Sequence, residues 1–207
     1  PGTPRSGARP GGGRAAEIHR RDGKGNGTHT AAGGQPQQAE SEDAQDKSAL
    51  QKKFESDAAE YSEAKTVQFD SKAPNFGAAG SADTVVTFRN VHNWVMGGNQ
   101  AAMFKAFFDV LKPGGVLGVT DHRAPAGEAT DGKHGYVTEK QVIDYATAAG
   151  FALAEKSEIN ANPKDVKDYP EGVWTLSPTL RLGDQDKDKW LAIGASDRAT
   201  LKFVTPR

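Results

Sequence analysis

The stretch that decides the fold is ADTVVTFRNVHNWVMGGNQAAMFKAFFDVLKPGGVLGVTDHRA, residues 82–124. Residues 85–88 form a nearly continuous apolar run, typical of a strand that helices cover on both faces. Across residues 100–111 the apolar side chains recur on one helical face, and residues 116–120 form a second apolar run. The stretch therefore predicts strand, polar loop, helix, Pro-Gly-Gly turn and strand, which is the second half of a nucleotide-cofactor α/β domain.

The flanking sequence predicts the other elements of one sheet. Thr138 is a good N-cap with Glu139 in the first turn, so a helix should begin there and end at Gly150. Strands and helices that alternate with short connections imply a mostly parallel sheet with right-handed crossovers. The further expected elements are a helix over 48–61, strands over 66–70, 151–159 and 200–204, and short elements near 173–174 and 190–193.

The composition divides the chain into two parts. Before Ala49 the only large apolar residue is Ile18, and ten of the 24 glycines lie before Gln35. Such a segment buries too little apolar surface to offset the entropy lost on ordering. We therefore expect a disordered Gly/Arg/Gln-rich segment over 1–47 and one α/β domain over 48–207, with an irregular insertion over 160–198.

Charge and cysteine content exclude several classes of function. The net charge is −1, which gives no whole-chain reason to expect a nucleic-acid or membrane partner. The absence of cysteine excludes disulfides, thiol catalysis and thiolate metal sites. No apolar run reaches the roughly 18 residues of a membrane span. A cytoplasmic location is favoured, and a periplasmic one stays open if a native N-terminus is missing.

Chemically useful side chains follow the predicted strands. In open α/β sheets ligands bind beyond the carboxyl ends of the strands, so the residues directly after each strand are the candidates for a site. They are Asp70 after the first predicted strand, Arg89, Asn90, His92, Asn93 and Trp94 after the second, and Asp121, His122 and Arg123 after the third.

At these positions the chain resembles the class I S-adenosylmethionine-dependent methyltransferases. Residues 110–117, VLKPGGVL, look like that family's turn between its fourth helix and fifth strand, and FRNV at 88–91 is similar to its motif after strand four. The combination of FRNVHNW, LKPGG, DHRA and GYV looks closer to a bacterial group of predicted methyltransferases. The resemblance covers residues 48–159 and the last strand, and implies a three-layer Rossmann-like fold.

The same resemblance implies a cofactor and its contacts. S-adenosylmethionine would be the methyl donor, with Asp70 near its adenine and with Arg89 and Asn90 beside its methionine end. The family's glycine-rich loop after strand one is missing or altered here. The sequence DGKGNG at 22–27 has a similar spacing, but the residues before it are not those of a buried strand. The implied fold is therefore incomplete at its N-terminus, and cofactor binding is impaired if the loop is lost.

The histidines are the candidate catalytic groups. His92 and His122 should end neighbouring strands and face one cleft, where either imidazole could act as a general base near neutral pH. Each could instead be a structural histidine bonded to a loop carbonyl. Together with Asp121 they could also form a two-His, one-carboxylate metal site, although no supporting motif accompanies them and no metal is predicted. The expected substrate-binding side chains are Asn93, Trp94, Arg123 and Tyr136.

These observations predict a methyltransferase that acts on a small-molecule acceptor. Two rival functions stay open: a non-catalytic, methyltransferase-like remnant or partner-binding module, and a nicotinamide-dependent oxidoreductase on a similar sheet. The missing glycine loop favours the remnant, whereas LKPGG together with FRNV argues against the oxidoreductase. The identity of the acceptor and the oligomeric state are beyond the sequence.

Overall fold

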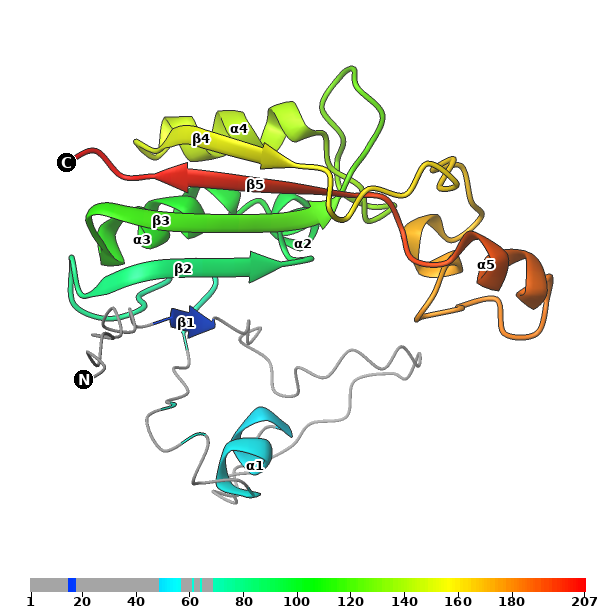
Figure 1. Ribbon diagram of the computed structural model, residues 1–207, viewed down its shortest axis with the longest axis horizontal. Helices are drawn as coiled ribbons and strands as arrows, with labels where there is room; N and C mark the ends of the chain where they lie inside the picture. The colour runs from blue at the N-terminus through cyan, green and yellow to red at the C-terminus, as the bar shows by residue number, and fades with distance from the viewer. Residues whose placement is uncertain (1–14, 18–48, 57–60, 62–63, 65–68) are drawn as a thin grey trace, which may run out of the picture.

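The computed structural model describes residues 15–17, 49–56, 61, 64 and 69–207 (Figure 1). These residues form one five-stranded sheet with helices packed against it, so the prediction of an α/β fold is confirmed. The strands are β1 (Ala15–Glu17), β2 (Ala82–Phe88), β3 (Leu111–His122), β4 (Ala152–Ser157) and β5 (Arg198–Val204). The helices are α1 (Ala49–Ser56), α2 (Val91–Gly97), α3 (Gln100–Val110), α4 (Glu139–Ala148), α5 (Lys187–Ile193) and the 3-10 helix η1 (Gly172–Thr175).

The strand order is β1-β2-β3-β5-β4. The pairs β1–β2 and β2–β3 are parallel, whereas β5 lies antiparallel between β3 and β4. Four strands therefore run in one direction and only β5 runs against them, which agrees with the predicted mostly parallel sheet. The parallel arrangement brings the carboxyl ends of β2 and β3 to the same edge of the sheet.

Helices α2, α3 and α4 lie behind the sheet in Figure 1 and contact β3 and β4. The core between the two layers contains Val85 and Leu117 from the strands and Phe104 and Phe107 from α3, all fully buried. The alternation of side chains along β2 places Val85 on the helical face and the half-buried Val86 on the other. The sequence predicts three layers. Among the described residues the structure shows two of them, the sheet and one layer of helices.

The predicted turn at Pro113-Gly114-Gly115 is part of β3 in the structure. Helix α3 ends at Val110, and the pairing of β3 with β2 shifts register between Ala82 and Thr84, opposite this turn. Gly114 has φ 76°, the left-handed conformation expected of a glycine at this point. The segment reverses the chain from the helix into the sheet and continues directly into the strand.

The insertion between β4 and β5 folds at the end of the sheet where β3 ends (Figure 1). It contains η1 and α5, as the aromatic residues near 174 and 190 predict. Two small clusters hold it together: Ala124, Tyr136 and Val173 in one, and Tyr169, Leu176 and Trp190 in the other. The insertion is therefore attached to the loop that follows β3.

The fold departs from the sequence-based expectations at two further points. Strand β1 lies inside the segment 1–47, because pairing with β2 uses backbone groups and requires no large apolar side chain. His92 lies in α2 and not at a strand end, since the chain turns into a helix directly after Asn90. The rest of segment 1–47 and the predicted strand residues 66–68 lie outside the described residues. None of the described helices is long and apolar enough to cross a membrane.

Candidate functional site

The site lies where β2 and β3 end. His92 is in the first turn of α2, two residues into the helix that follows β2, and Asp121 and His122 are the last two residues of β3. Because the two strands are parallel neighbours, these side chains meet, and the ring centroids of the two histidines are 5.3 Å apart. The structure therefore brings both predicted catalytic histidines together.

Asp121 is the centre of this group. Its Oδ1 lies 2.9 Å from His92 Nδ1 and accepts the backbone N–H of His122 at 2.7 Å, and its Oδ2 accepts the backbone N–H of His92 at 3.1 Å. Only 2% of the residue is exposed. Burial by itself raises the pKa of Asp121, but the adjacent imidazoles and the hydrogen bonds outweigh it and hold the pKa below its usual value.

His122 has a different environment. Its Nδ1 is hydrogen bonded to the hydroxyl of Ser196, which the insertion contributes just before β5. Burial lowers the pKa of His122 to about 4, although the negative charge of Asp121 opposes the shift. Its ring is therefore neutral at physiological pH.

Two aromatic residues cover the histidines. The ring centroid of Trp174 lies 6.0 Å from that of His92, and Tyr136 lies 6.3 Å from His122. The loop after β3 also approaches closely, because a Cβ at Gly132 would lie 2.5 Å from the backbone oxygen of His92. A side chain at this position is excluded, so the backbone of the loop packs directly over α2.

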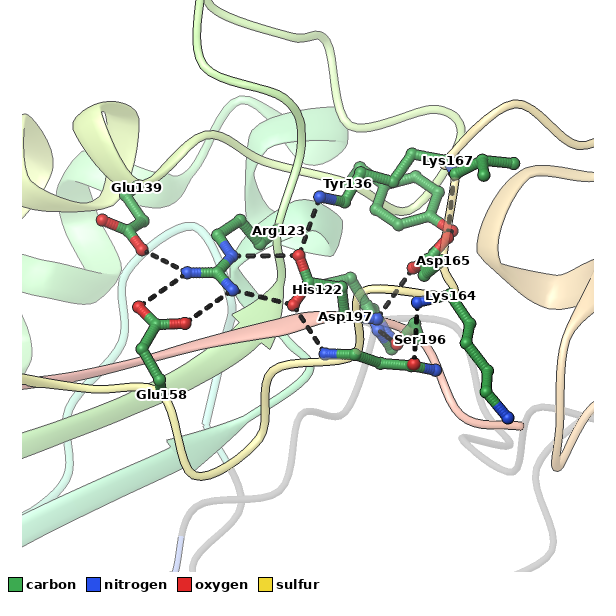
Figure 2. Close-up of polar contacts among 12 residues, drawn as sticks. His122, Arg123, Tyr136, Glu139, Glu158, Lys164, Asp165, Lys167, Ser196 and Asp197 are labelled. Carbon is green, nitrogen blue, oxygen red and sulfur yellow. Dashed lines mark hydrogen bonds and ion pairs between the residues drawn. The ribbon is translucent and has the colours of Figure 1, made fainter. Parts of the chain in front are cut away.

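Arg123 connects the end of β3 to three other elements. Figure 2 shows its guanidinium among three carboxylates: Glu139 at the start of α4 at 2.9 Å, Glu158 after β4 at 2.8 Å and Asp197 before β5 at 2.8 Å. Hydrogen bonds to Asp197 and Glu158 raise the pKa of Arg123. Because three carboxylates of the chain bind this guanidinium, Arg123 has the geometry of a structural cross-link.

A second set of contacts continues from Asp197 into the insertion (Figure 2). Lys167 Nζ lies 2.7 Å from Asp197, and the backbone N–H of Asp197 donates to Asp165 at 2.7 Å. Asp165 also accepts the Tyr136 hydroxyl at 3.2 Å. Burial first, and then the charge of Asp165, raise the pKa of Tyr136, so its hydroxyl keeps its proton. Tyr136 is thereby held with its ring beside His122.

Two predicted cofactor residues lie at the same edge. Arg89 has φ 55°, a conformation that costs a non-glycine residue free energy, and its N–H donates to Thr120 O at 2.8 Å. Its guanidinium is exposed and makes no hydrogen bond or ion pair with any other described residue. Asn90 is partly buried and its amide lies 3.4 Å from Thr87 Oγ1. An exposed cation and a partly buried amide thus follow β2 directly.

The remaining predicted residues lie elsewhere. Asp70 is exposed and caps its own turn by accepting the backbone N–H of Lys72 at 2.9 Å. Trp94 is buried in the core against Phe104 and Phe107, and Asn93 reaches back to the backbone oxygen of Arg89 at 3.5 Å. The structure does not bring these three side chains to the histidines.

Two cavities flank the end of β3. One, of about 240 Å³, lies beside Tyr136, His134 and Lys167. The other, of about 580 Å³, lies between the loop after β3 and the start of α4, beside Ile143 and Lys156. Ala124, which follows β3 closely, lines both of them.

Sequence reasoning missed the residues that the insertion contributes. Asp165, Ser196 and Asp197 belong to a charged, poorly periodic stretch with no motif, yet all three are buried. A signal becomes readable only once the antiparallel pairing of β3 and β5 is known, because an acidic residue directly before a strand then lies opposite a basic residue directly after its neighbour. Asp197 and Arg123 are such a pair.

Comparison with known proteins supports the fold. No protein-family model and no curated protein sequence matches the chain. Among solved structures, a candidate sarcosine dimethylglycine methyltransferase from Galdieria sulphuraria is 11% identical, with a TM-score of 0.50 over 75% of this chain and 64% of that one. The [4+2]-cyclase SpnF is 17% identical, with a TM-score of 0.49 over 76% and 63%.

A SAM-dependent methyltransferase from Methanosarcina mazei is 12% identical, with a TM-score of 0.44 over 70% of this chain and 68% of that one. The chain thus spans somewhat under two thirds of the cyclase and of the Galdieria enzyme. At such identities the likeness concerns architecture. The chain has the fold of the class I S-adenosylmethionine-dependent methyltransferases.

Proposed function

We propose that the protein is an S-adenosylmethionine-dependent methyltransferase that acts on a small-molecule acceptor. The observation that carries the proposal is that Arg89 and Asn90 directly follow β2 at the edge of the sheet where His92 and His122 also lie. In open α/β sheets this edge is where ligands bind. A methyltransferase needs polar groups that hold the donor, and an acceptor that is protonated also needs a base; this edge offers both kinds of group.

The described residues fit the cofactor on its methionine side. The exposed guanidinium of Arg89, which pairs with no other residue that the structure describes, can bind a carboxylate in the bidentate manner that arginine favours, and the amide of Asn90 can donate beside it. When bound, S-adenosylmethionine supplies a methyl group on a positively charged sulfur. The aromatic residues around the histidines exclude water, which strengthens the local electrostatic interactions.

The histidines would serve the acceptor. His92 or His122 would accept the proton of the acceptor's hydroxyl or amine as that group takes the methyl from the bound sulfonium. The sulfur would keep the electron pair of the broken carbon–sulfur bond. The acceptor would lie near Tyr136. In this proposal Arg123 acts by holding the loop after β3.

A calorimetric titration with S-adenosylhomocysteine tests the cofactor site. We expect binding in the micromolar range, and we expect Arg89→Ala to weaken it about tenfold or more, because a hydrogen bond to a charged group contributes roughly 1.5–3 kcal/mol. Lys105→Ala is the matched control, since Lys105 is an exposed cation already paired with Asp109 on α3. It should leave the affinity unchanged.

The rival function is that of a methyltransferase-like remnant or partner-binding module. The burial of His92 and Asp121 favours it, because only 3% and 2% of these residues are exposed and an acceptor reaches them only if the cover moves. A chain that melts cooperatively but gives no heat with S-adenosylhomocysteine would support the remnant and refute the proposed enzyme.

A further inference from the structure

His92 and Asp121 form a pair whose geometry defines the tautomer of the ring. An ionised carboxylate has no hydrogen to donate, so the short contact between His92 Nδ1 and Asp121 Oδ1 at 2.9 Å requires the hydrogen to be on Nδ1. The other ring nitrogen, Nε2, then carries a lone pair. A neutral imidazole in this state can accept a proton only at Nε2.

The carboxylate cannot rotate away from the ring. Two backbone N–H groups, those of His92 and His122, donate to its two oxygens at 3.1 and 2.7 Å. One of these amides belongs to His92 itself, so Asp121 binds both the backbone and the ring of that residue. The start of α2 and the end of β3 are thereby joined through one side chain.

His122 lacks such a fixed partner. Its Nδ1 faces the hydroxyl of Ser196, which can donate or accept a hydrogen bond. The hydroxyl therefore does not determine where the hydrogen of the ring lies. Of the two histidines, only His92 has its tautomer imposed by a buried carboxylate.

We propose that Asp121 is a positioning residue that holds His92 in the Nδ1–H tautomer, so that His92 Nε2, and not His122, is the base of the reaction. The catalytic meaning of this inference rests on the proposed methyltransferase function. The tautomer itself does not, because the hydrogen bonds of the folded chain determine it.

A metal site is the competing explanation for the same three residues. One ligand atom each of His92, Asp121 and His122 lies within 4.8 Å of the others. Three N–H groups already occupy the carboxylate, however, and a metal on His92 Nδ1 would replace the hydrogen bond to Asp121. The contacts within the folded chain therefore favour the His–Asp pair.

Nitrogen NMR of the chain labelled in its histidine rings tests the proposal directly. Spectra at mildly alkaline pH distinguish a protonated from an unprotonated ring nitrogen, and the signals that vanish in His92→Gln identify His92. We expect the wild-type ring to be protonated at Nδ1 alone. A ring protonated at Nε2, or an equal mixture, would overturn the proposal.

The variant Asp121→Asn tests the role of the carboxylate. In Asp121 the ring and the His122 amide share Oδ1 while the His92 amide uses Oδ2, so one backbone N–H loses its acceptor in either orientation of the Asn side chain. The carboxylate that imposes the Nδ1–H tautomer is gone, and wherever the NH₂ group faces Nδ1 the ring must carry its hydrogen on Nε2. We therefore expect the Nε2–H tautomer of His92 to become populated. Ser196→Ala is the matched control, which should alter the His122 signals and leave those of His92 unchanged. A His92 spectrum that is identical in Asp121→Asn would refute the positioning role.

Two further titrations separate the possible failures. If S-adenosylhomocysteine does not bind the wild-type chain, the proposed function fails while the tautomer result stands. If it binds wild type and Asp121→Asn equally but the ring is in the wrong tautomer, only this inference fails. Tight binding of Zn²⁺ that shifts the signals of both histidines would overturn the inference in favour of a metal site.

Discussion

At the scale of single residues, two neighbouring histidines have different surroundings because their hydrogen-bond partners differ. His92 and His122 are the same residue type with rings 5.3 Å apart, yet one faces a carboxylate and the other a hydroxyl. A buried imidazole without a full ionic partner remains neutral, because burial disfavours the charged form. This difference has a consequence for stability that can be measured.

The free energy of unfolding should fall as the pH falls below about 6.5. The pKa of His122 is lowered from 6.5 to about 4 in the folded chain, so between these values the unfolded chain binds a proton that the folded chain does not. At 1.36 kcal/mol per pKa unit, and because the unfolded ring is only half protonated at pH 6.5, the loss between pH 6.5 and about pH 5 is roughly 1.5 kcal/mol. Urea denaturation at several pH values measures it.

The variant His122→Gln supplies the comparison. It keeps a polar group beside Ser196 but does not titrate, so its free energy of unfolding should depend less steeply on pH over the same interval. If wild type and variant lose stability in parallel between about pH 6.5 and about pH 5, His122 is not the group responsible.

At the scale of elements, one charged cluster connects the ends of several strands and a helix. Arg123 joins the end of β3 to the start of α4, to the residue after β4 and to the residue before β5. Its side chain is 19% exposed, and that of Asp197 only 6%. Removing one partner of such a group leaves a buried charge poorly compensated, which is much more costly than losing an exposed pair.

Replacing Arg123 by Met should therefore lower the free energy of unfolding by about 3 kcal/mol, within the range for breaking a buried ion pair. The matched control is Lys140→Met, which removes an exposed pair with Asp144 on α4 and should cost less than about 0.5 kcal/mol. Denaturant unfolding of both variants measures the difference. Equal effects would show that the three carboxylates hold Arg123 no more firmly than a surface pair.

At the scale of the whole molecule, stability depends on the last strand of the chain. β5 is the final element in sequence but lies inside the sheet between β3 and β4, and its Phe203 is 0% exposed. The insertion before β5 also closes over the candidate site. The end of the sequence thus completes both the core and the site.

Shortening the buried side chain of β5 should consequently be severe. We expect Phe203→Ala to lower the free energy of unfolding by about 3–5 kcal/mol, because it leaves a cavity in the core. Ile159→Ala is the control, since Ile159 is 82% exposed and its truncation should change stability by no more than about 0.5 kcal/mol. Melting of both variants checks the contrast, and a mild effect of Phe203→Ala would contradict an interior position for β5.

The sequence alone predicted the strands β2 and β3, the helices α3 and α4 and the histidine pair, because the signals for them are local. Each of these signals involves residues that are close together in the sequence: the apolar periodicity, the Thr138 cap and the residues after each strand. Only the tertiary structure decided that Trp94 lies in the core, that carboxylates occupy Arg123, and that Ser196 and Asp197 reach the site from the insertion. Those contacts join residues 74 positions apart for His122–Ser196 and Arg123–Asp197, and a local pattern carries no information about partners at such separations.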